Sequence, residues 1–237
     1  MIERDDELEL DQKGLEFLPG EDSSASPRAT GFGYGRGIDD NDVVEFLREM
    51  GEIDDLAELE RMALACRRCH LRETCNTVVF GEGSPEARLV FVGEAPGADE
   101  DRQGRPFVGR AGRLLDRILT ACGLERGEVY ITNIVKCRPS SNRTPTEAER
   151  NYCIPYLHAQ MRLIEPEIIV TLGAAATQGL IDPRARITRM RGSWQWWHGI
   201  RVMPTFHPAA LLRDPNKKAP VWEDMKKILA YLESGEE

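Results

Sequence analysis

The feature that most constrains the fold of this chain is a short apolar run that ends abruptly in glycine and acid. Residues 90–101 read VFVGEAPGADED, and Leu89 extends the apolar run at its start. Such a run is typical of a buried parallel strand, and open α/β folds bind their ligands where these strands end. The turn has neither the G-x-G-x-x-G spacing of a dinucleotide fold nor the lysine motif of a P-loop. Its carboxylates would also repel phosphate, so the sequence predicts a neutral or electron-poor ligand at this turn.

Three more strand-like runs follow, and helical patterns lie between them. The predicted strands are residues 89–92, 129–135, 167–172 and 200–205. The clearest predicted helices are residues 111–122, 147–164, 174–180 and 221–232. Strands that alternate with helices indicate a parallel sheet covered on both faces, so we predict a three-layer α/β/α sandwich with a short four-stranded parallel sheet. The chemically suggestive residues follow strand ends, and we expect them to converge on one site.

Charge divides the chain unevenly along its length. The first 60 residues hold 19 acidic and 5 basic residues, which leaves 21 acidic and 26 basic residues in the remainder. We therefore expect an acidic, disordered tail over residues 1–40, a helical lead-in over 41–65 and the main domain over 66–237. A mildly basic domain permits nucleic-acid binding without requiring it. The tail is expected to be a linker or an interaction segment of unknown partner.

The sequence shows no sign of a membrane or export signal. No window approaches the roughly 20 apolar residues that a membrane-spanning helix needs. The opening segment, MIERDDELEL, is too acidic for a signal peptide, so we expect a cytoplasmic protein. We also expect the protein to be a monomer. In a reducing compartment, cysteines serve metal binding or catalysis more often than disulfides.

The chain has six cysteines, at positions 66, 69, 75, 122, 137 and 153. Cys66 and Cys69 form a C-x2-C pair, a spacing that is rare by chance and typical of metal sites. Four thiolates suit either zinc or an iron–sulfur cluster, and spacing does not decide between them. Cys122 is expected in the core, whereas Cys75 could replace one of the ligands.

Four motifs in order resemble the family 4 uracil-DNA glycosylases, the iron–sulfur branch of the uracil-glycosylase superfamily in bacteria and archaea. The motifs are GEAPGADED, GRPFVGRAG, TNIVKCRP and HPAALLR, and the resemblance covers about residues 66–232. It implies an enzyme that excises uracil from DNA and so initiates base excision repair. The implied ligands of a [4Fe–4S] cluster are Cys66, Cys69, Cys137 and Cys153. The implied uracil pocket consists of Gly93, Glu94, Ala95, Phe107, Asn133 and His207.

One branch of the superfamily cross-links to DNA through a histidine in an insert before the fourth cysteine. Here that segment reads RPSSNRTPTEAERNY, with neither insert nor histidine. We therefore expect a monofunctional enzyme that turns over.

The residue types agree with that chemistry. Phe107 can stack on a flat uracil, a contact worth roughly 1–3 kcal/mol per base. The amide of Asn133 can donate to O4 and accept from N3–H, a pattern that cytosine reverses. His207 is expected to stabilise the uracil anion at O2, and Glu94 or Glu100 to act electrostatically or position water.

The HPAALLR motif also suggests how DNA is held. Leu211 and Leu212 are predicted to wedge into the base stack after the uracil flips out, and Arg213 to meet a phosphate. The expected partner is uracil-containing DNA, single- or double-stranded. Three alternatives stay open: a different lesion opposite guanine, a non-catalytic cysteine-cluster DNA-binding module, and a redox protein.

Overall fold

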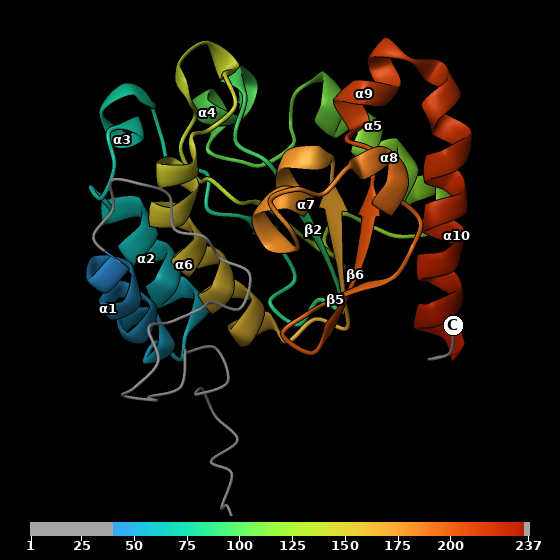
Figure 1. The fold of residues 1–237 in the computed structure, drawn as a ribbon. Coiled ribbons are helices and arrows are strands. Elements are labelled where there is room, and N and C mark those ends of the chain that lie inside the picture. The colour runs from blue at the N-terminus through green and yellow to red at the C-terminus, as the bar shows by residue number, and fades with distance from the viewer. Residues whose placement is uncertain (1–39, 235–237) are drawn as a thin grey trace, which may run out of the picture.

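Six strands form one mixed sheet at the centre of the molecule, in the order β1-β3-β2-β4-β6-β5. The computed structural model of the chain describes residues 40–234 (Figure 1). The strands are β1 (Glu82–Gly83), β2 (Leu89–Gly93), β3 (Tyr130–Asn133), β4 (Ile168–Leu172), β5 (Gln195–Trp197) and β6 (Ile200–Thr205).

The four central strands are the predicted ones, and all three pairings among them are parallel. The prediction of only four strands is wrong, because β1 and β5 add antiparallel edges. β5 is joined to β6 by His198 and Gly199, which have φ of 45° and 78°. Two successive residues with positive φ are typical of the tight hairpin turn whose twist matches paired strands. The short aromatic run before this turn is therefore strand as well as core packing.

Ten α-helices accompany the sheet in the described residues. They are α1 (Asp40–Gly51), α2 (Leu56–Ala65), α3 (Leu71–Thr74), α4 (Ala98–Gln103), α5 (Arg110–Ala121), α6 (Glu147–Ile164), α7 (Ala174–Leu180), α8 (Ile187–Met190), α9 (Pro208–Arg213) and α10 (Lys218–Ser234). None of them is both long and apolar enough to span a membrane. The predicted lead-in corresponds to α1 and α2, which pack against α6. The predicted tail lies outside the described residues, except for its last residue at the start of α1.

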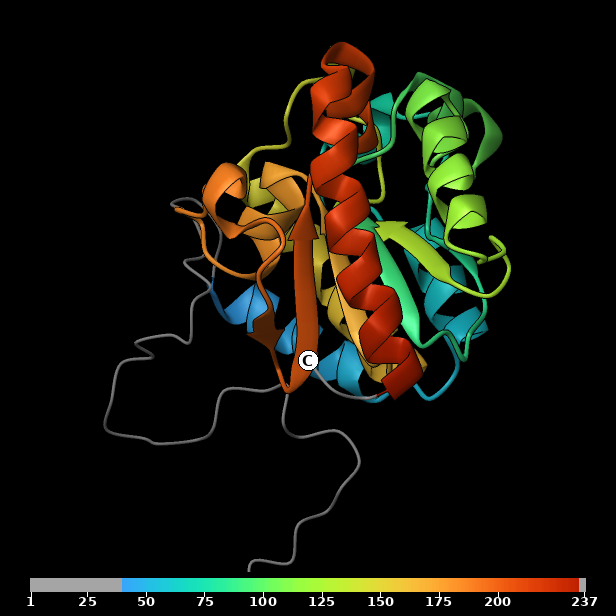
Figure 2. The same cartoon turned by 90° about the vertical axis from the view of Figure 1, so that its right-hand side faces the viewer.

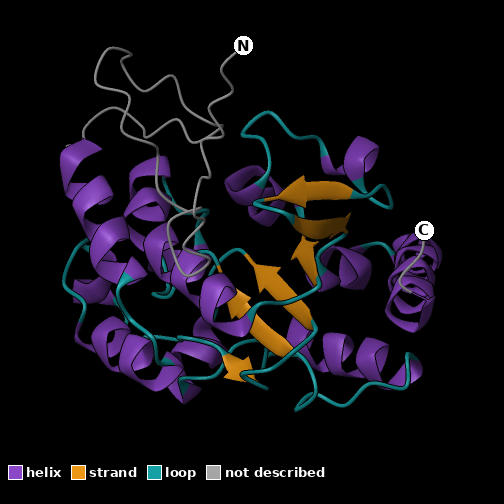
Figure 3. Cartoon of the chain, turned by 90° about the horizontal axis from the view of Figure 1, so that it is seen from below, coloured by secondary structure: helices purple, strands orange, loops and turns teal. Residues whose placement is uncertain are grey.

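Alternating side chains of the strands fill two separate cores. Val90 and Val92 belong to the core beneath α1, α2, α6 and α7. Leu89 and Phe91 belong to the core beneath α5, α9 and α10. Figures 2 and 3 show α5 and α10 on one face and the α1–α2–α6 group on the other. The three-layer sandwich is thus confirmed, and the period-two alternation of each buried strand builds it.

The register of the parallel strands brings the motif ends together. Gly93 pairs with Asn133 across β2 and β3. Leu172 pairs with Thr205 across β4 and β6, so that Gly173 and Phe206-His207 follow side by side. The glycine turn, the asparagine and the histidine therefore reach the same edge of the sheet.

Candidate active site

A cavity of about 800 Å³ opens at the carboxyl edge of the parallel strands. The helices α4, α7 and α9 begin at this edge (Figure 1). Seven of the predicted site residues line it: Glu94, Ala95, Glu100, Phe107, Asn133, His207 and Arg213. They come from four separate segments of the chain, so the predicted convergence is confirmed.

Gly93 is not itself in the lining of the cavity, but its lack of a side chain leaves room for two residues that are. A Cβ there would lie 2.3 Å from Oδ1 of Asn133 and 2.6 Å from the ring of Phe107. Such separations are well below van der Waals contact, so any larger residue would displace the amide, the ring or both. Asn133 is only 2% exposed at the end of β3. The amide and the aromatic ring are thus held against each other over a bare backbone.

The loop that carries Phe107 is fixed in an unusual conformation. Phe107 has φ of 51°, a region that few residues with a side chain adopt. Oε1 of Glu100 accepts the backbone N–H groups of Val108 at 2.9 Å and Gly109 at 2.8 Å, and Oε2 accepts that of Gly97 at 3.1 Å. A strained backbone of this kind persists only where its surroundings determine it. Glu100 therefore ties the glycine turn to the aromatic loop.

His207 is locked by the helix that it begins. Its Nδ1 accepts the backbone N–H of Ala209 at 3.1 Å, so the ring proton lies on Nε2. Burial, with Arg213 acting in the same direction, lowers the pKa of His207 to about 4, while Glu100 opposes the shift. The ring centroids of His207 and Phe107 lie 5.6 Å apart. A neutral imidazole with a fixed Nε2–H donor therefore stands beside the aromatic ring.

The acidic cluster after the turn divides by function. Glu94 and Glu100 line the cavity, and burial raises the pKa of Glu94 against the opposing effects of Thr144 and Arg150. Asp101 lies away from the cavity: its Oδ1 accepts the backbone N–H of Asn76 at 2.8 Å. Of the four carboxylates in this segment, Glu94 and Glu100 line the cavity, and Asp99 and Asp101 do not.

The four predicted cysteine ligands surround a second, smaller pocket between α2, α3 and α6. Cys66, Cys69, Cys137 and Cys153 all line it, whereas Cys75 and Cys122 do not. Burial raises the pKa of the Cys153 thiol to about 12, and nearby Cys69 and Cys66 act in the same direction. Crowded thiols of this kind suit metal cations, which bind the thiolate form.

The donor set fits an anionic metal–thiolate group on independent grounds. Nε of Arg68 and Nε of Arg72 are buried in the lining of this pocket without a hydrogen-bond partner among the described residues. Buried donors normally have acceptors, and thiolate or sulfide sulfur would supply them. No three His, Cys, Asp or Glu side chains of residues 40–234 lie close enough together to hold a single ion.

A family model described as the uracil DNA glycosylase superfamily matches residues 80–232, nearly two thirds of the chain. The chain belongs to this superfamily. Similar proteins include a type-4 uracil-DNA glycosylase of Sulfurisphaera tokodaii, 45% identical over 74% of this chain and 84% of that protein. The type-4 enzyme of Thermotoga maritima is 46% identical over 70% of this chain and 89% of its own. The type-4 enzyme of Archaeoglobus fulgidus is 42% identical over 74% of this chain and 92% of that protein.

The structure corrects the prediction that Leu211 wedges into DNA. Leu211 is 2% exposed and packs in the core with Val221 and Met225 of α10, so it is not available as a wedge. Leu212 is 37% exposed, and Arg213 lines the cavity. Successive residues of a helix point in different directions, so only one of the two leucines can face DNA.

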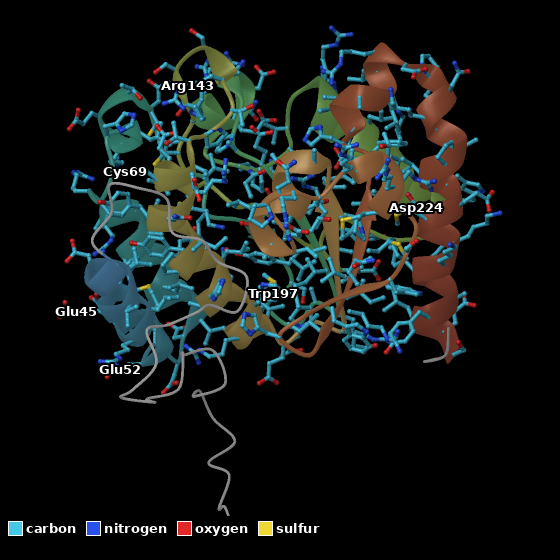
Figure 4. All side chains as sticks on the ribbon, in the orientation of Figure 1. Glu45, Glu52, Cys69, Arg143, Trp197 and Asp224 are labelled. Carbon is cyan, nitrogen blue, oxygen red and sulfur yellow. The ribbon has the colours of Figure 1, made fainter. Side chains whose placement is uncertain are left out.

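Sequence reasoning missed one wall of the cavity in this superfamily member. Asn142, Arg143 and Thr144 line it from the loop before α6. Arg143, which is labelled in Figure 4, donates to the carboxylate of the buried Glu149 at 2.6 Å and 2.7 Å. Arg143 comes first among the causes that lower the pKa of Glu149 to about 2. The signal was the capping box that begins at Thr146, because its Glu149 has oxygens left for an arginine.

Proposed function

We propose that this superfamily member is a uracil-DNA glycosylase that flips uracil out of DNA and hydrolyses its N-glycosidic bond. The observation that carries the proposal is the cavity that Phe107, Asn133 and His207 line together, where Gly93 leaves room for the amide and the aromatic ring. The names of the type-4 relatives support the same activity. The products are free uracil and an abasic site, so the reaction initiates base excision repair.

Base recognition falls to Phe107 and Asn133. Phe107 stacks on the flipped base, and the Asn133 amide donates to O4 and accepts from N3–H. The Gly93–Ala95 turn contributes backbone to the same pocket. Cytosine presents the opposite pattern at these two positions, so it leaves the buried amide unpaired.

Bond cleavage leaves negative charge on uracil O2 and cationic character on the sugar. Nε2–H of neutral His207 donates to O2 as this charge develops, because Nδ1 is already occupied by the N–H of Ala209. Glu94 and Glu100 stabilise the cationic sugar or position the attacking water. Leu212 and Arg213 contact the DNA around the flipped nucleotide.

The four cysteines around the second pocket would hold a [4Fe–4S] cluster. A zinc ion held by the same four thiols is the alternative, because both groups take soft sulfur ligands. When bound, the cluster supplies a cross-link between α2–α3, the end of β3 and α6. We assign it this structural role.

The first test is base release. The full chain is incubated with a uracil-containing oligonucleotide, in single- and double-stranded form, and abasic sites are cleaved with alkali. We expect strand scission with uracil and none with a matched thymine control. DNA binding without scission would instead support a non-catalytic cysteine-cluster module.

The second test assigns the residues. His207→Ala should lower the single-turnover rate by about 10²–10³-fold without changing base preference. Asn133→Asp should instead alter the preference between uracil and cytosine. If neither variant changes uracil release, the proposed site is wrong.

A further inference from the structure

Lys136 is a fully buried lysine between the two pockets. It is 2% exposed, and its Nζ donates to Oγ1 of Thr132 at 2.6 Å, the backbone oxygen of Asn133 at 2.8 Å and Oε1 of Gln160 at 2.6 Å. None of these three acceptors is a carboxylate. A buried ammonium with only neutral acceptors is costly, because hydrogen bonds alone do not replace the solvation of its charge.

The cysteine pocket adjoins Lys136 and is a source of negative charge when its thiols are deprotonated. Lys136 lines that pocket, and its backbone N–H donates to Sγ of Cys153 at 3.2 Å. A metal centre with four thiolate ligands brings negative charge to this point. The ammonium therefore has a counter-charge when the cysteines are loaded.

The same ammonium reaches the base-reading strand end. Beyond the carbonyl of Asn133, the backbone N–H groups of Ile134 and Val135 donate to the carbonyls of Gly93 and Glu94, at 3.0 Å and 3.1 Å. The short segment 133–136 thus contacts the uracil turn on one side and the cysteine pocket on the other. A displacement at Lys136 would move the Asn133 amide relative to Gly93, where no spare space exists.

We propose that Lys136 is a positioning residue that couples the loaded cysteine site to base recognition by fixing the backbone of Asn133. The cluster then does more than stabilise the fold, because its charge holds the lysine that holds the asparagine. This inference rests on the proposed roles of Asn133 and of the four cysteines. It assigns a function to Lys136, the one lysine that is buried among residues 40–234.

The test compares two Lys→Met variants of the full chain, purified with its iron. Lys136→Met keeps the length of the side chain but removes its charge and donors, and Lys226→Met does the same to a half-exposed lysine of α10. We expect Lys136→Met to lower the single-turnover rate of uracil release by about 10–100-fold, the effect of a small misplacement in a site. Affinity for abasic DNA should be unchanged, and iron should be lost faster to a chelator. Lys226→Met should match the wild type throughout.

A double-mutant cycle separates positioning from a general loss of structure. If Lys136 acts through Asn133, adding Lys136→Met to Asn133→Ala lowers the rate no further. Added to His207→Ala, at the start of α9, Lys136→Met multiplies the loss. The proposal would be overturned if Lys136→Met lowered the rate by the same factor in the Asn133→Ala and His207→Ala backgrounds. A wild-type rate for the single variant Lys136→Met would overturn it too.

Folding failure of Lys136→Met would not end the test. Thr132→Val retains the lysine and removes one of its three acceptors, and it should show a smaller loss with the same dependence on Asn133. If the rate losses of Thr132→Val and Asn133→Ala multiply in the double variant, the proposal is overturned here too. Absence of uracil release by the wild type would be a failure of the proposed function. In that case unchanged iron retention in Lys136→Met would still overturn the coupling to the cysteine site.

Discussion

The two halves of the active site are held in place by different means. The backbone oxygen of Asn133, at the end of β3, accepts from the buried Lys136, whose own backbone N–H donates to Cys153. His207, at the end of β6, depends on an ion pair within the protein. In Figure 4, Cys69 and Arg143 lie on the α6 side and Asp224 on the α10 side. On the proposed roles, a cofactor would complete the base-reading half, whereas the ion pair behind the leaving-group half lies within the protein.

The ion pair joins Asp224 of α10 to Arg191, which follows α8. Asp224 is fully buried; its Oδ2 accepts from Oγ1 of Thr205 at 2.6 Å and from Nε of Arg191 at 3.1 Å. Nη2 of Arg191 also donates to the carbonyl of Pro220 at 2.5 Å. These contacts fix the last residue of β6 two positions before His207. They explain how a strand end and a short helix can hold an imidazole rigidly.

The largest effect expected from this comparison is on stability. Asp224→Ala should lower the free energy of unfolding by about 3 kcal/mol, because it leaves a largely buried guanidinium without its partner. Iron content per folded chain should stay at the wild-type value. Denaturant unfolding combined with an iron assay measures both.

Asp182→Ala is the matched control, since its partner Arg184 is 92% exposed. We expect a change within about 0.5 kcal/mol for this surface pair. Loss of iron in Asp224→Ala would contradict the comparison, because it would mean that the two halves are not independently held.

The same contrast shows how far the sequence determines this molecule. The buried strands and their alternation predict the parallel centre of the sheet, and motif order places Phe107, Asn133 and His207 at one edge. Local sequence patterns do not predict the contacts between segments that are distant in the chain. The burial of Leu211 depends on where α10 lies, and the hydrogen bonds of Lys136 depend on Gln160 in α6. The two edge strands were missed because two or three residues give too little periodicity to detect.

The next largest effect concerns the Phe107 loop, which lies between the two halves. Glu100→Ala removes the acceptor of three backbone N–H groups and should slow uracil release by about 10–100-fold through misplacement of the ring. Glu100→Gln retains one oxygen for Val108 and Gly109 and should lose less than about 10-fold. Single-turnover rates with saturating enzyme make the comparison. Equal losses would mean that the charge of Glu100 matters more than its hydrogen bonds.

The smallest expected effect is an absence of pH dependence in the leaving-group half. Because burial lowers the pKa of His207 to about 4, its imidazole stays neutral from pH 8 to about pH 5, and the single-turnover rate should show no inflection near 6.5 from this residue. A descending limb centred near 6.5 that His207→Ala abolishes would contradict the assignment of a neutral donor.

Stability should respond to pH where the rate does not. Between pH 6.5 and about 4 the unfolded chain binds a proton at His207 and the folded chain does not, so stability falls as pH falls. The wild type minus His207→Ala isolates this contribution, whose slope approaches about 1.4 kcal/mol per pH unit. Denaturant midpoints at pH 7, 6 and 5 give the slope. A difference that does not change with pH would mean that His207 binds its proton equally in the folded and the unfolded chain. Below pH 6.5 the folded imidazole would then carry that proton and could no longer accept the N–H of Ala209.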